Sequence, residues 1–194
     1  MKQKACFLDR DGTINYDPGY LGDPEKVKLL DGVAEGISLL KNSFNFKIIV
    51  VSNQSGISRG LISEDQVNAV NKKINRLLAA ENAAIDDFYL CAYHPDFSEP
   101  KLTGCRKPSP EMILKAAEDH GIDLSGSYMA GDKATDVLCG KNAGVKTILI
   151  AGEETKKELK LLKIDNIYPN FVAANFSAAC KFIIDDLSGD LIDK

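Results

Sequence analysis

Short apolar segments alternate with longer amphipathic segments along this chain, and this alternation limits the folds that the chain can adopt. Residues 5–8, 47–51 and 146–150 are brief apolar runs of the kind that form strands buried on both faces. The segments between them carry apolar residues at helical spacing. Strands that alternate with helices pack as a parallel sheet covered on both sides. We therefore predict an α/β fold, doubly wound and Rossmann-like, in which residues 1–194 form a single domain.

Several predicted elements have recognisable ends. Ser63 and Gln66 form the pattern of a capping box, and Pro110 after Ser109 is typical of a helix start. Gly121 and Gly144 are typical helix stops. The predicted strands are 5–8, 47–51, 87–91, 127–130 and 146–150, and the predicted helices are 32–41, 63–81, 109–120 and 134–143, followed by a weaker helix, a strand and a final helix.

Composition excludes some function classes. The net charge is −4, so the chain has no basic excess to neutralise nucleic acid phosphates. The apolar run that follows the first four residues is too short for a signal peptide or a membrane span. We therefore expect a cytoplasmic monomer that binds neither nucleic acid nor membrane. Its five scattered cysteines are expected to be free thiols, with Cys6, Cys139 and Cys180 packed in the core.

Four polar or reactive residues lie at the ends of predicted strands. Asp9, Ser52, Cys91 and Asp132 each stand at or just after the carboxyl end of a strand. Ligands of open parallel sheets bind at this edge. The four positions therefore indicate one site.

Asp9 and Asp11 form the most informative pair in this set. Two carboxylates at the end of a buried strand repel each other, and a hard cation such as Mg²⁺ would relieve that repulsion. Asp9 can attack phosphorus, and Asp11 can protonate the leaving oxygen and then activate water. Gly12 permits the tight turn that follows. An isolated pair would more often be a polar turn, and the other residues at the same edge favour chemistry.

Three further segments fit a phosphoryl-transfer site. Ser52 and the small-residue loop with Asn53, Gln54 and Ser55 can grip phosphoryl oxygens, although an ordinary strand-to-helix turn looks the same. Lys107 can neutralise the transferred group, although a lone Arg-Lys is more commonly a solvated pair.

The third of these segments is Gly131-Asp132-Lys133-Ala-Thr-Asp136. Asp132 is placed to bind the metal and Lys133 to reach substrate, while Asp136 can orient Lys107 or a metal-bound water. Acidic residues that only complement the dipole of the following helix would give the same pattern.

Taken together, Asp9-Arg-Asp-Gly-Thr, Ser52, Lys107 and Gly131-Asp132-Lys-Ala-Thr-Asp136 resemble the four ordered motifs of the haloacid dehalogenase superfamily. Asp11, which the dehalogenases lack, points to a phosphatase. Residues 5–150 resemble the branch that contains the D,D-heptose 1,7-bisphosphate and histidinol-phosphate phosphatases. The resemblance implies that Mg²⁺ is held by Asp9, Asp132 and the main-chain carbonyl of Asp11.

The resemblance also implies a capless enzyme, and the two short segments 17–28 and 53–105 leave no room for a lid domain. Specificity would then come from short loops. The expected contacts to a small sugar phosphate are Arg10, Asp17, Gly19, Tyr20, Asn53, Gln54, Ser55, Arg59, Arg106 and Lys133.

The chain departs from this family at its zinc loop. Many members hold a structural zinc with Cys-x-His and Cys-x-Cys, whereas this chain has Cys91-Ala-Tyr-His94 and Thr103-Gly-Cys105. Structural zinc needs four closed ligands, and Cys91, His94 and Cys105 supply three. We expect a loop without zinc, with free thiols at Cys91 and Cys105; a three-ligand zinc site is the alternative.

The resemblance implies hydrolysis of the C7 phosphate of a heptose 1,7-bisphosphate through an aspartyl-phosphate, as a step in nucleotide-activated heptose synthesis. Histidinol phosphate or another small phosphomonoester is the alternative substrate. A catalytically idle binding module is the remaining alternative, and the presence of both Asp9 and Asp11 disfavours it.

Overall fold

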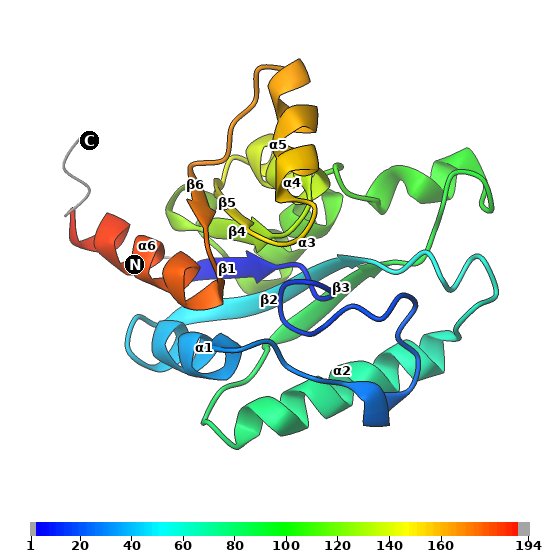
Figure 1. Ribbon diagram of the computed structural model, residues 1–194, viewed down its shortest axis with the longest axis horizontal. Coiled ribbons are helices and arrows are strands. Elements are labelled where there is room, and N and C mark those ends of the chain that lie inside the picture. Colours follow the sequence, from blue (N-terminus) through cyan, green and yellow to red (C-terminus); the bar gives the residue numbers. More distant parts are fainter. Residues whose placement is uncertain (1–2, 190–194) are drawn as a thin grey trace.

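The computed structural model describes residues 3–189 and contains a six-stranded parallel sheet with the order β3-β2-β1-β4-β5-β6 (Figure 1). This is the doubly wound Rossmann-like order, in which the chain leaves the central strand in both directions. The fold class predicted from the alternating segments is confirmed. The strands are β1 (Lys4–Leu8), β2 (Phe46–Asn53), β3 (Asp87–Cys91), β4 (Tyr128–Gly131), β5 (Lys146–Ile150) and β6 (Phe171–Ala173).

Six α-helices in the described part of the chain cover both faces of the sheet. On one face, α1, α2 and α6 contribute to a single apolar core, and on the other α3, α4 and α5 pack against the sheet (Figure 1). The helices are α1 (Val33–Asn42), α2 (Glu64–Ala79), α3 (Glu111–His120), α4 (Ala134–Ala143), α5 (Thr155–Ile164) and α6 (Phe176–Ser188), with short 3₁₀ turns η1 (Pro24–Lys26), η2 (Pro100–Cys105) and η3 (Leu124–Gly126).

The central strand, β1, is apolar throughout because helices cover both of its faces. Ala5 and Phe7 point into the core beneath α3 and α4, whereas Cys6 and Leu8 point into the core beneath α1, α2 and α6. All four side chains are buried. A strand with a helix layer on each side has no solvent face, so both sets of alternating residues must be apolar.

The predicted helix ends are largely confirmed. Both hydrogen bonds of the Ser63–Gln66 capping box are present, and Gly121 and Gly144 end their helices with φ of 63° and 77°. Pro110 caps α3 instead of occupying its first position. Strand β2 extends beyond the predicted 47–51, because Ser52 and Asn53 pair with Leu90 and Cys91 of β3.

The connections that could hold a lid are short. Within residues 3–189, the connection between β1 and α1 forms the η1 turn and two isolated bridges, and the connection between β3 and α3 forms the η2 turn. The carboxyl edge of the sheet therefore has no separate domain above it in the described chain. That all 194 residues form a single domain stays a prediction.

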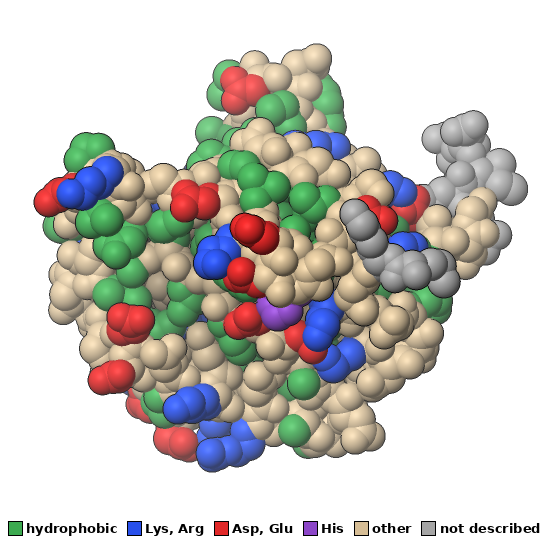
Figure 2. Space-filling view, turned by 180° about the vertical axis from the view of Figure 1, so that it is seen from behind, with side chains coloured by type: hydrophobic (Ala, Val, Ile, Leu, Met, Phe, Trp, Pro, Cys, Tyr) green, Lys and Arg blue, Asp and Glu red, His purple; other side chains and the backbone are tan. Residues whose placement is uncertain are grey.

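The surface carries charges of both signs. On the side opposite to the view of Figure 1, acidic and basic side chains are interspersed (Figure 2). This mixture fits the net charge of −4 and gives no basic stripe on that face for a phosphate backbone. Within residues 3–189, no helix combines the length and apolar character needed to cross a membrane.

Asp86 directly precedes β3, at the amino ends of the strands, and it links β3 to β2 and α1 there. Its carboxylate accepts a hydrogen bond of 2.8 Å from the Ile48 N–H and forms ion pairs with Lys41 and Lys47. Burial alone would raise the pKa of Asp86, but the Ile48 hydrogen bond and the two lysines lower it below its usual range. The folded state therefore favours the ionised form.

Replacing Asp86 with Ala is expected to lower the free energy of unfolding by about 1–3 kcal/mol at pH 7, because the Ile48 N–H loses its partner. The contribution of Asp86 is complete above its unfolded pKa of about 4 and disappears as the pH falls through the folded pKa. Urea denaturation at pH 7 and pH 3 measures this. Asp86→Asn, which keeps the acceptor, should fall between wild type and Asp86→Ala. If the free energies of unfolding of wild type and Asp86→Ala differed by the same amount at pH 7 and at pH 3, the assignment would be contradicted.

Candidate active site

The two aspartates that end β1 and β4 lie beside each other. Asp9 follows Leu8 and Asp132 follows Gly131, and Leu8 pairs with Ala130 in the sheet. The Asp9 N–H donates to the Ala130 carbonyl at 3.0 Å. These strands are neighbours although about 120 residues separate them, because the chain starts its second half at the other side of β1.

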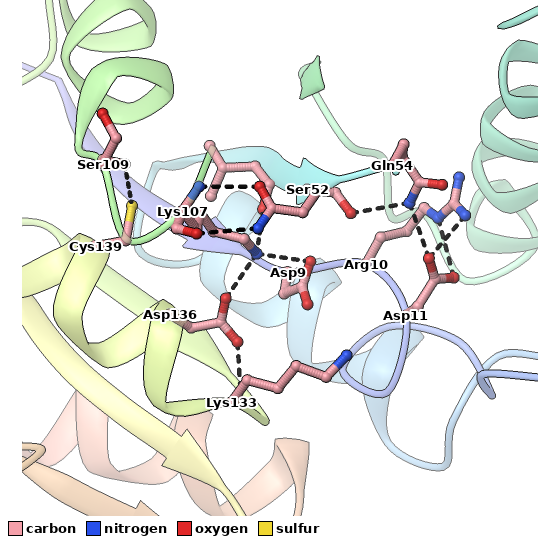
Figure 3. Close-up of polar contacts among 12 residues, drawn as sticks. Asp9, Arg10, Asp11, Ser52, Gln54, Lys107, Ser109, Lys133, Asp136 and Cys139 are labelled. Carbon is pink, nitrogen blue, oxygen red and sulfur yellow. Dashed lines mark hydrogen bonds and ion pairs between the residues drawn. The ribbon is translucent and has the colours of Figure 1, made fainter. Parts of the chain in front are cut away.

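Lys107 lies beneath this edge and joins three segments (Figure 3). Its ammonium Nζ lies 2.8 Å from Asp9 Oδ1, 2.6 Å from Asp136 Oδ1 and 2.8 Å from the Val51 carbonyl. The side chain is buried. Burial alone would lower the pKa of Lys107, but the carboxylates of Asp136 and Asp9 raise it above its usual range. Lys107 therefore stays charged and uses all three of its donors.

Asn53 fixes the main chain at Lys107. Its side-chain Nδ2 donates to the Lys107 carbonyl at 3.2 Å, and its Oδ1 accepts from the Lys107 N–H at 3.0 Å. This pair of hydrogen bonds ties the end of β2 to the loop before α3. Asn53 lines the cavity, and its amide is engaged by Lys107 in this structure. Its contact with substrate stays a prediction.

Asp9, Asp132 and Asp136 form an acidic cluster. One ligand atom from each lies within 4.8 Å of the others. Burial, followed by the charge of Asp9, raises the pKa of Asp132 to about 7. Burial also raises the pKa of Asp136, to about 6, against the opposing effect of Lys107. Without a cation, burial and mutual repulsion therefore disfavour the simultaneous ionisation of all three carboxylates.

This donor set fits a divalent cation with hard oxygen ligands. The Oδ1 atom of Asp132 is buried and has no hydrogen-bond partner among the described residues. No described residue donates a hydrogen bond to the main-chain carbonyl of Asp11 either. Oxygen atoms of these two kinds are what Mg²⁺ prefers. Asp9 and Asp132, predicted as metal ligands, are brought together, and Asp136 joins them while also contacting Lys107, as predicted.

Asp11 accepts four hydrogen bonds, three of which come from Arg10 and Gln54 (Figure 3). Arg10 donates from Nε to Oδ1 at 3.1 Å and from NH2 to Oδ2 at 2.8 Å. Asn15 and Gln54 donate one further bond each at 2.9 Å. Burial alone would raise the pKa of Asp11, but Arg10 and these amides lower it below its usual range.

The prediction that Arg10 contacts substrate is wrong for this structure. Its side chain is 0% exposed and does not line the cavity. The guanidinium turns into the core, where its NH1 donates to Asn71 of α2 at 3.1 Å. The sequence showed a cation between two aspartates, and only the packing of α2 shows that it faces inward.

An open cavity of about 510 Å³ lies above these groups. The Ser52 hydroxyl at its wall accepts a hydrogen bond of 3.0 Å from Gln54 Nε2, whereas the Gln54 N–H is used by the Cys91 carbonyl. The lining includes Gly56 and Thr135, which were not predicted, and the predicted residues Asp9, Asp11, Asp17, Gly19, Tyr20, Ser52, Asn53, Gln54, Ser55, Arg106, Lys107, Lys133 and Asp136.

Two cations face this cavity from different sides. The carboxylates of Asp132 and Asp9 raise the pKa of Lys133 despite burial, which favours its charged form. Arg106 donates from NH1 to the Tyr93 carbonyl at 3.3 Å, and burial and the nearby Arg59 lower its pKa. Both positions suit an anionic ligand.

Arg59, also predicted to contact substrate, does not line the cavity. Its NH2 lies 2.9 Å from His94 Nε2, and its guanidinium lies over the ring of Phe97, 4.9 Å from the centroid. The structure therefore corrects its placement: Arg59 packs on the loop after β3 and lies near Arg106.

The prediction of free thiols at Cys91 and Cys105 is wrong in this structure, which joins them by a disulfide. The η2 turn brings Cys105 back to the end of β3, where Cys91 is buried. His94 contacts Arg59 and accepts from the Asp96 N–H at 3.2 Å. The absence of zinc stays a prediction. Cys6, Cys139 and Cys180 are free and buried, as predicted.

Sequence reasoning missed buried polar residues around the site, among them Asn15, which donates to Asp11, and Asn71 and Glu158. Asn71 lies on the buried stripe of α2, and the signal for it was a polar residue at helical spacing among Val67, Ile74 and Leu78. Glu158 of α5 accepts a hydrogen bond of 2.7 Å from the Ala134 N–H at the start of α4. Its position shows no sequence signal that separates it from surface glutamates.

Comparison with known proteins places the chain among phosphatases. The HAD-hydrolase-like family model matches residues 104–179. The D-glycero-D-manno-heptose-1,7-bisphosphate 7-phosphatase of Chlorobaculum tepidum is 38% identical over 179 residues, which cover 88% of each chain. The D-glycero-alpha-D-manno-heptose-1,7-bisphosphate 7-phosphatase of Burkholderia mallei is 42% identical over 153 residues, 77% of this chain and 80% of that one.

A solved structure supports the same placement. The D,D-heptose 1,7-bisphosphate phosphatase of B. bronchiseptica, complexed with magnesium and phosphate, superposes with a TM-score of 0.82 at 27% identity. The superposition covers 95% of this chain and 99% of that one.

Gly12 is expected to be essential for the acidic cluster. A Cβ at Gly12 would lie 2.5 Å from Asp132 Oδ2, and its φ is +81°. Gly12→Ala should displace Asp132 and reduce the rise in melting temperature that Mg²⁺ produces by binding the folded state. Gly60→Ala is the control, because Gly60 has a φ of +70° with nothing within 4 Å of its Cβ position. An equal Mg²⁺ effect in both variants would contradict this role.

Proposed function

We propose a function on the premise that this chain belongs to the D-glycero-D-manno-heptose-1,7-bisphosphate 7-phosphatase family of HAD-like hydrolases, as its 38% identity over 179 residues to the C. tepidum enzyme shows. The chain is a phosphatase. Its proposed reaction is the removal of the C7 phosphate from a heptose 1,7-bisphosphate, as a step toward nucleotide-activated heptose.

One observation carries the proposed mechanism. Lys107 holds the Asp9 carboxylate through Oδ1, and among the described residues no side-chain hydrogen bond or ion pair engages Asp9 Oδ2. Asp9 lines the open cavity and accepts a single cation, so one of its oxygens is fixed and the other can reach a ligand. This is the arrangement that a positioned carboxylate nucleophile needs.

In the first step, an Asp9 oxygen attacks phosphorus, a bond forms between them, and the bond from phosphorus to the sugar oxygen breaks. Asp11 is ionised in this structure, so it must first take up a proton from solvent, which it then passes to the departing oxygen. Lys107 keeps its positive charge beside the reacting carboxylate, and the Ser52 hydroxyl at the cavity wall can donate to a phosphoryl oxygen.

In the second step, Asp11 removes a proton from water, which attacks the phosphorus of phospho-Asp9. The bond from phosphorus to Asp9 breaks, inorganic phosphate leaves, and Asp9 returns as a carboxylate. Asp11 lines the cavity, and one of its four hydrogen bonds, such as that from Gln54, must be released before its oxygen can reach the leaving group and then water.

Asp9, Asp132 and the Asp11 carbonyl would hold Mg²⁺, with Asp136 nearby. When bound, the cation supplies positive charge that stabilises the transferred phosphoryl group. The orphaned Asp132 Oδ1 and the three clustered carboxylates support this part of the proposal.

The openness of the cavity supports a substrate that is selected by short loops. Asp17, Gly19 and Tyr20 line one side, and Asp17 Oδ1 accepts from the Gly19 N–H at 2.8 Å. Arg106 lines the other side and suits a second phosphate through its guanidinium fork. Histidinol phosphate, which has a single phosphate, remains the alternative substrate.

We further propose that the chain acts as a cytoplasmic monomer without nucleic acid or membrane partners. The absence of a basic excess supports the first exclusion. The proposed partner is a small sugar phosphate. A catalytically idle module is disfavoured because Asp9, Asp11, Lys107 and Asp132 are all present at the same edge.

The substrate proposal is tested by phosphate release from the α and β anomers of heptose 1,7-bisphosphate and from histidinol phosphate. We expect Mg²⁺-dependent release from a bisphosphate, abolished by EDTA, and a far lower rate with histidinol phosphate. The recovered product should keep its C1 phosphate. Equally negligible rates on all three compounds would refute the substrate assignment.

Asp9→Asn is expected to lower kcat by at least about a thousandfold, because the amide cannot act as the nucleophile. The matched control is Asp65→Asn, which changes an exposed carboxylate of α2 outside the cavity. Acid-quenched enzyme incubated with ³²P-labelled substrate should carry label in wild type and none in Asp9→Asn. Full activity of Asp9→Asn would refute the mechanism.

A further inference from the structure

Arg10 is a buried cation with no route to the substrate. Its side chain is 0% exposed, and it lies behind the cavity wall. Its main-chain carbonyl accepts hydrogen bonds from the Ile14 and Asn15 N–H groups at 2.8 and 3.2 Å. Both the backbone and the guanidinium of Arg10 are therefore held in place. The guanidinium in turn holds the Asp11 carboxylate.

The Asp11 carboxylate is saturated with donors. Oδ1 accepts from Arg10 Nε and Asn15, and Oδ2 accepts from Arg10 NH2 and Gln54. A carboxylate has about four lone-pair sites, so all of them are engaged in this structure. One of the two amide bonds must be released before Asp11 can exchange a proton, whereas the Arg10 fork can stay in place. Arg10 supplies two of the four bonds in a side-on fork, and a fork fixes the plane of the carboxylate as well as its position.

Asn71 binds the Arg10 guanidinium on the side away from Asp11. It is buried on α2, and its Oδ1 accepts from Arg10 NH1 at 3.1 Å. Helix α2 otherwise contributes Val70, Ile74 and Leu78 to the core beneath β1. Because the helix is packed there, Asn71 ties the guanidinium to a part of the fold that does not belong to the catalytic loop.

We propose that Arg10 is a positioning residue that sets the orientation of Asp11, with Asn71 as its anchor on α2. The proposal rests on the proposed function, in which Asp11 moves the proton to the leaving oxygen and from the attacking water. Arg10 acts through Asp11 alone, so its loss alters the reaction step and leaves substrate binding intact.

If Arg10 orients Asp11, then disturbing Arg10 should lower kcat and leave KM unchanged. A residue that contacted the substrate would change KM when replaced, whereas one that orients Asp11 changes kcat. Misplacing a reacting group by about 1 Å can cost roughly a hundredfold in rate. Asn71 gives a cleaner test than Arg10, because it contacts neither Asp11 nor the cavity.

The experiment compares two replacements of Asn71. Asn71→Leu removes the acceptor for Arg10 and is expected to lower kcat roughly ten- to a hundredfold, with KM within about twofold of wild type. Asn71→Asp keeps an acceptor oxygen at the same place and is expected to retain kcat within about threefold. Asn68→Leu, the same change at an exposed position of α2, is the control and should match wild type.

Several results would overturn the proposal. A raised KM with unchanged kcat in Asn71→Leu would mean that the pair serves substrate binding. Unchanged constants in Asn71→Leu, or an equal loss of kcat in Asn71→Leu and Asn71→Asp, would show that the Arg10–Asn71 bond has no positioning role. If Asn71→Leu does not fold, Arg10→Lys replaces it, because an ammonium cannot donate the fork, and the same fall in kcat is expected.

Each variant is assayed with heptose 1,7-bisphosphate and with p-nitrophenyl phosphate. If wild type hydrolyses only p-nitrophenyl phosphate, the substrate proposal fails, and the comparison of Asn71 variants on that compound still decides the role of Arg10. A crystal structure of Asn71→Leu gives a readout that needs no activity. The Asp11 carboxylate should be displaced in Asn71→Leu and unmoved in Asn71→Asp, and an unmoved Asp11 in Asn71→Leu would overturn the inference.

Discussion

The buried ammonium of Lys107 is the interaction on which the carboxyl edge of this sheet depends. It binds Asp9 from the end of β1, Asp136 from α4 and the Val51 carbonyl of β2. Without it, two buried carboxylates would face each other at the cost of several kcal/mol per ion. Asn53 clamps the Lys107 main chain, so the cation is placed by backbone geometry and not by a mobile stem. The orientation of the Asp9 carboxylate follows from this single group.

The buried charges behind the cavity are divided into pairs with different functions. Lys107 forms ion pairs with Asp9 and Asp136, and Arg10 forms an ion pair with Asp11. Asp132 is left with an oxygen that no described residue contacts, and its pKa is raised to about 7 by burial and by Asp9. A protein-derived cation would fill that position permanently. Under the proposed function, this position would take an exchangeable cation, which would relieve the repulsion within the cluster.

Much of the site could be predicted because its residues lie at the ends of strands, and the ends of apolar runs in the sequence indicate where strands end. Asp9, Ser52 and Asp132 follow apolar runs, so their convergence on one edge required only a parallel sheet. The errors fell on side chains whose direction depends on a distant partner. Arg10 turns inward to Asn71, Arg59 turns to His94 and Phe97, and Cys91 pairs with Cys105. None of these partners lies within ten residues of the group that it holds.

By itself the sequence determined the doubly wound fold, the helix caps and the chemical character of the site, because periodicity, capping residues and residue type are local properties. Only the tertiary structure decided which charges balance one another. Ion pairs and hydrogen bonds form between groups that packing brings within about 3 Å, and such distances depend on every intervening element. Arg10 illustrates the limit: the sequence placed a cation between two aspartates, and the packing of α2 directed it away from the substrate and onto Asp11.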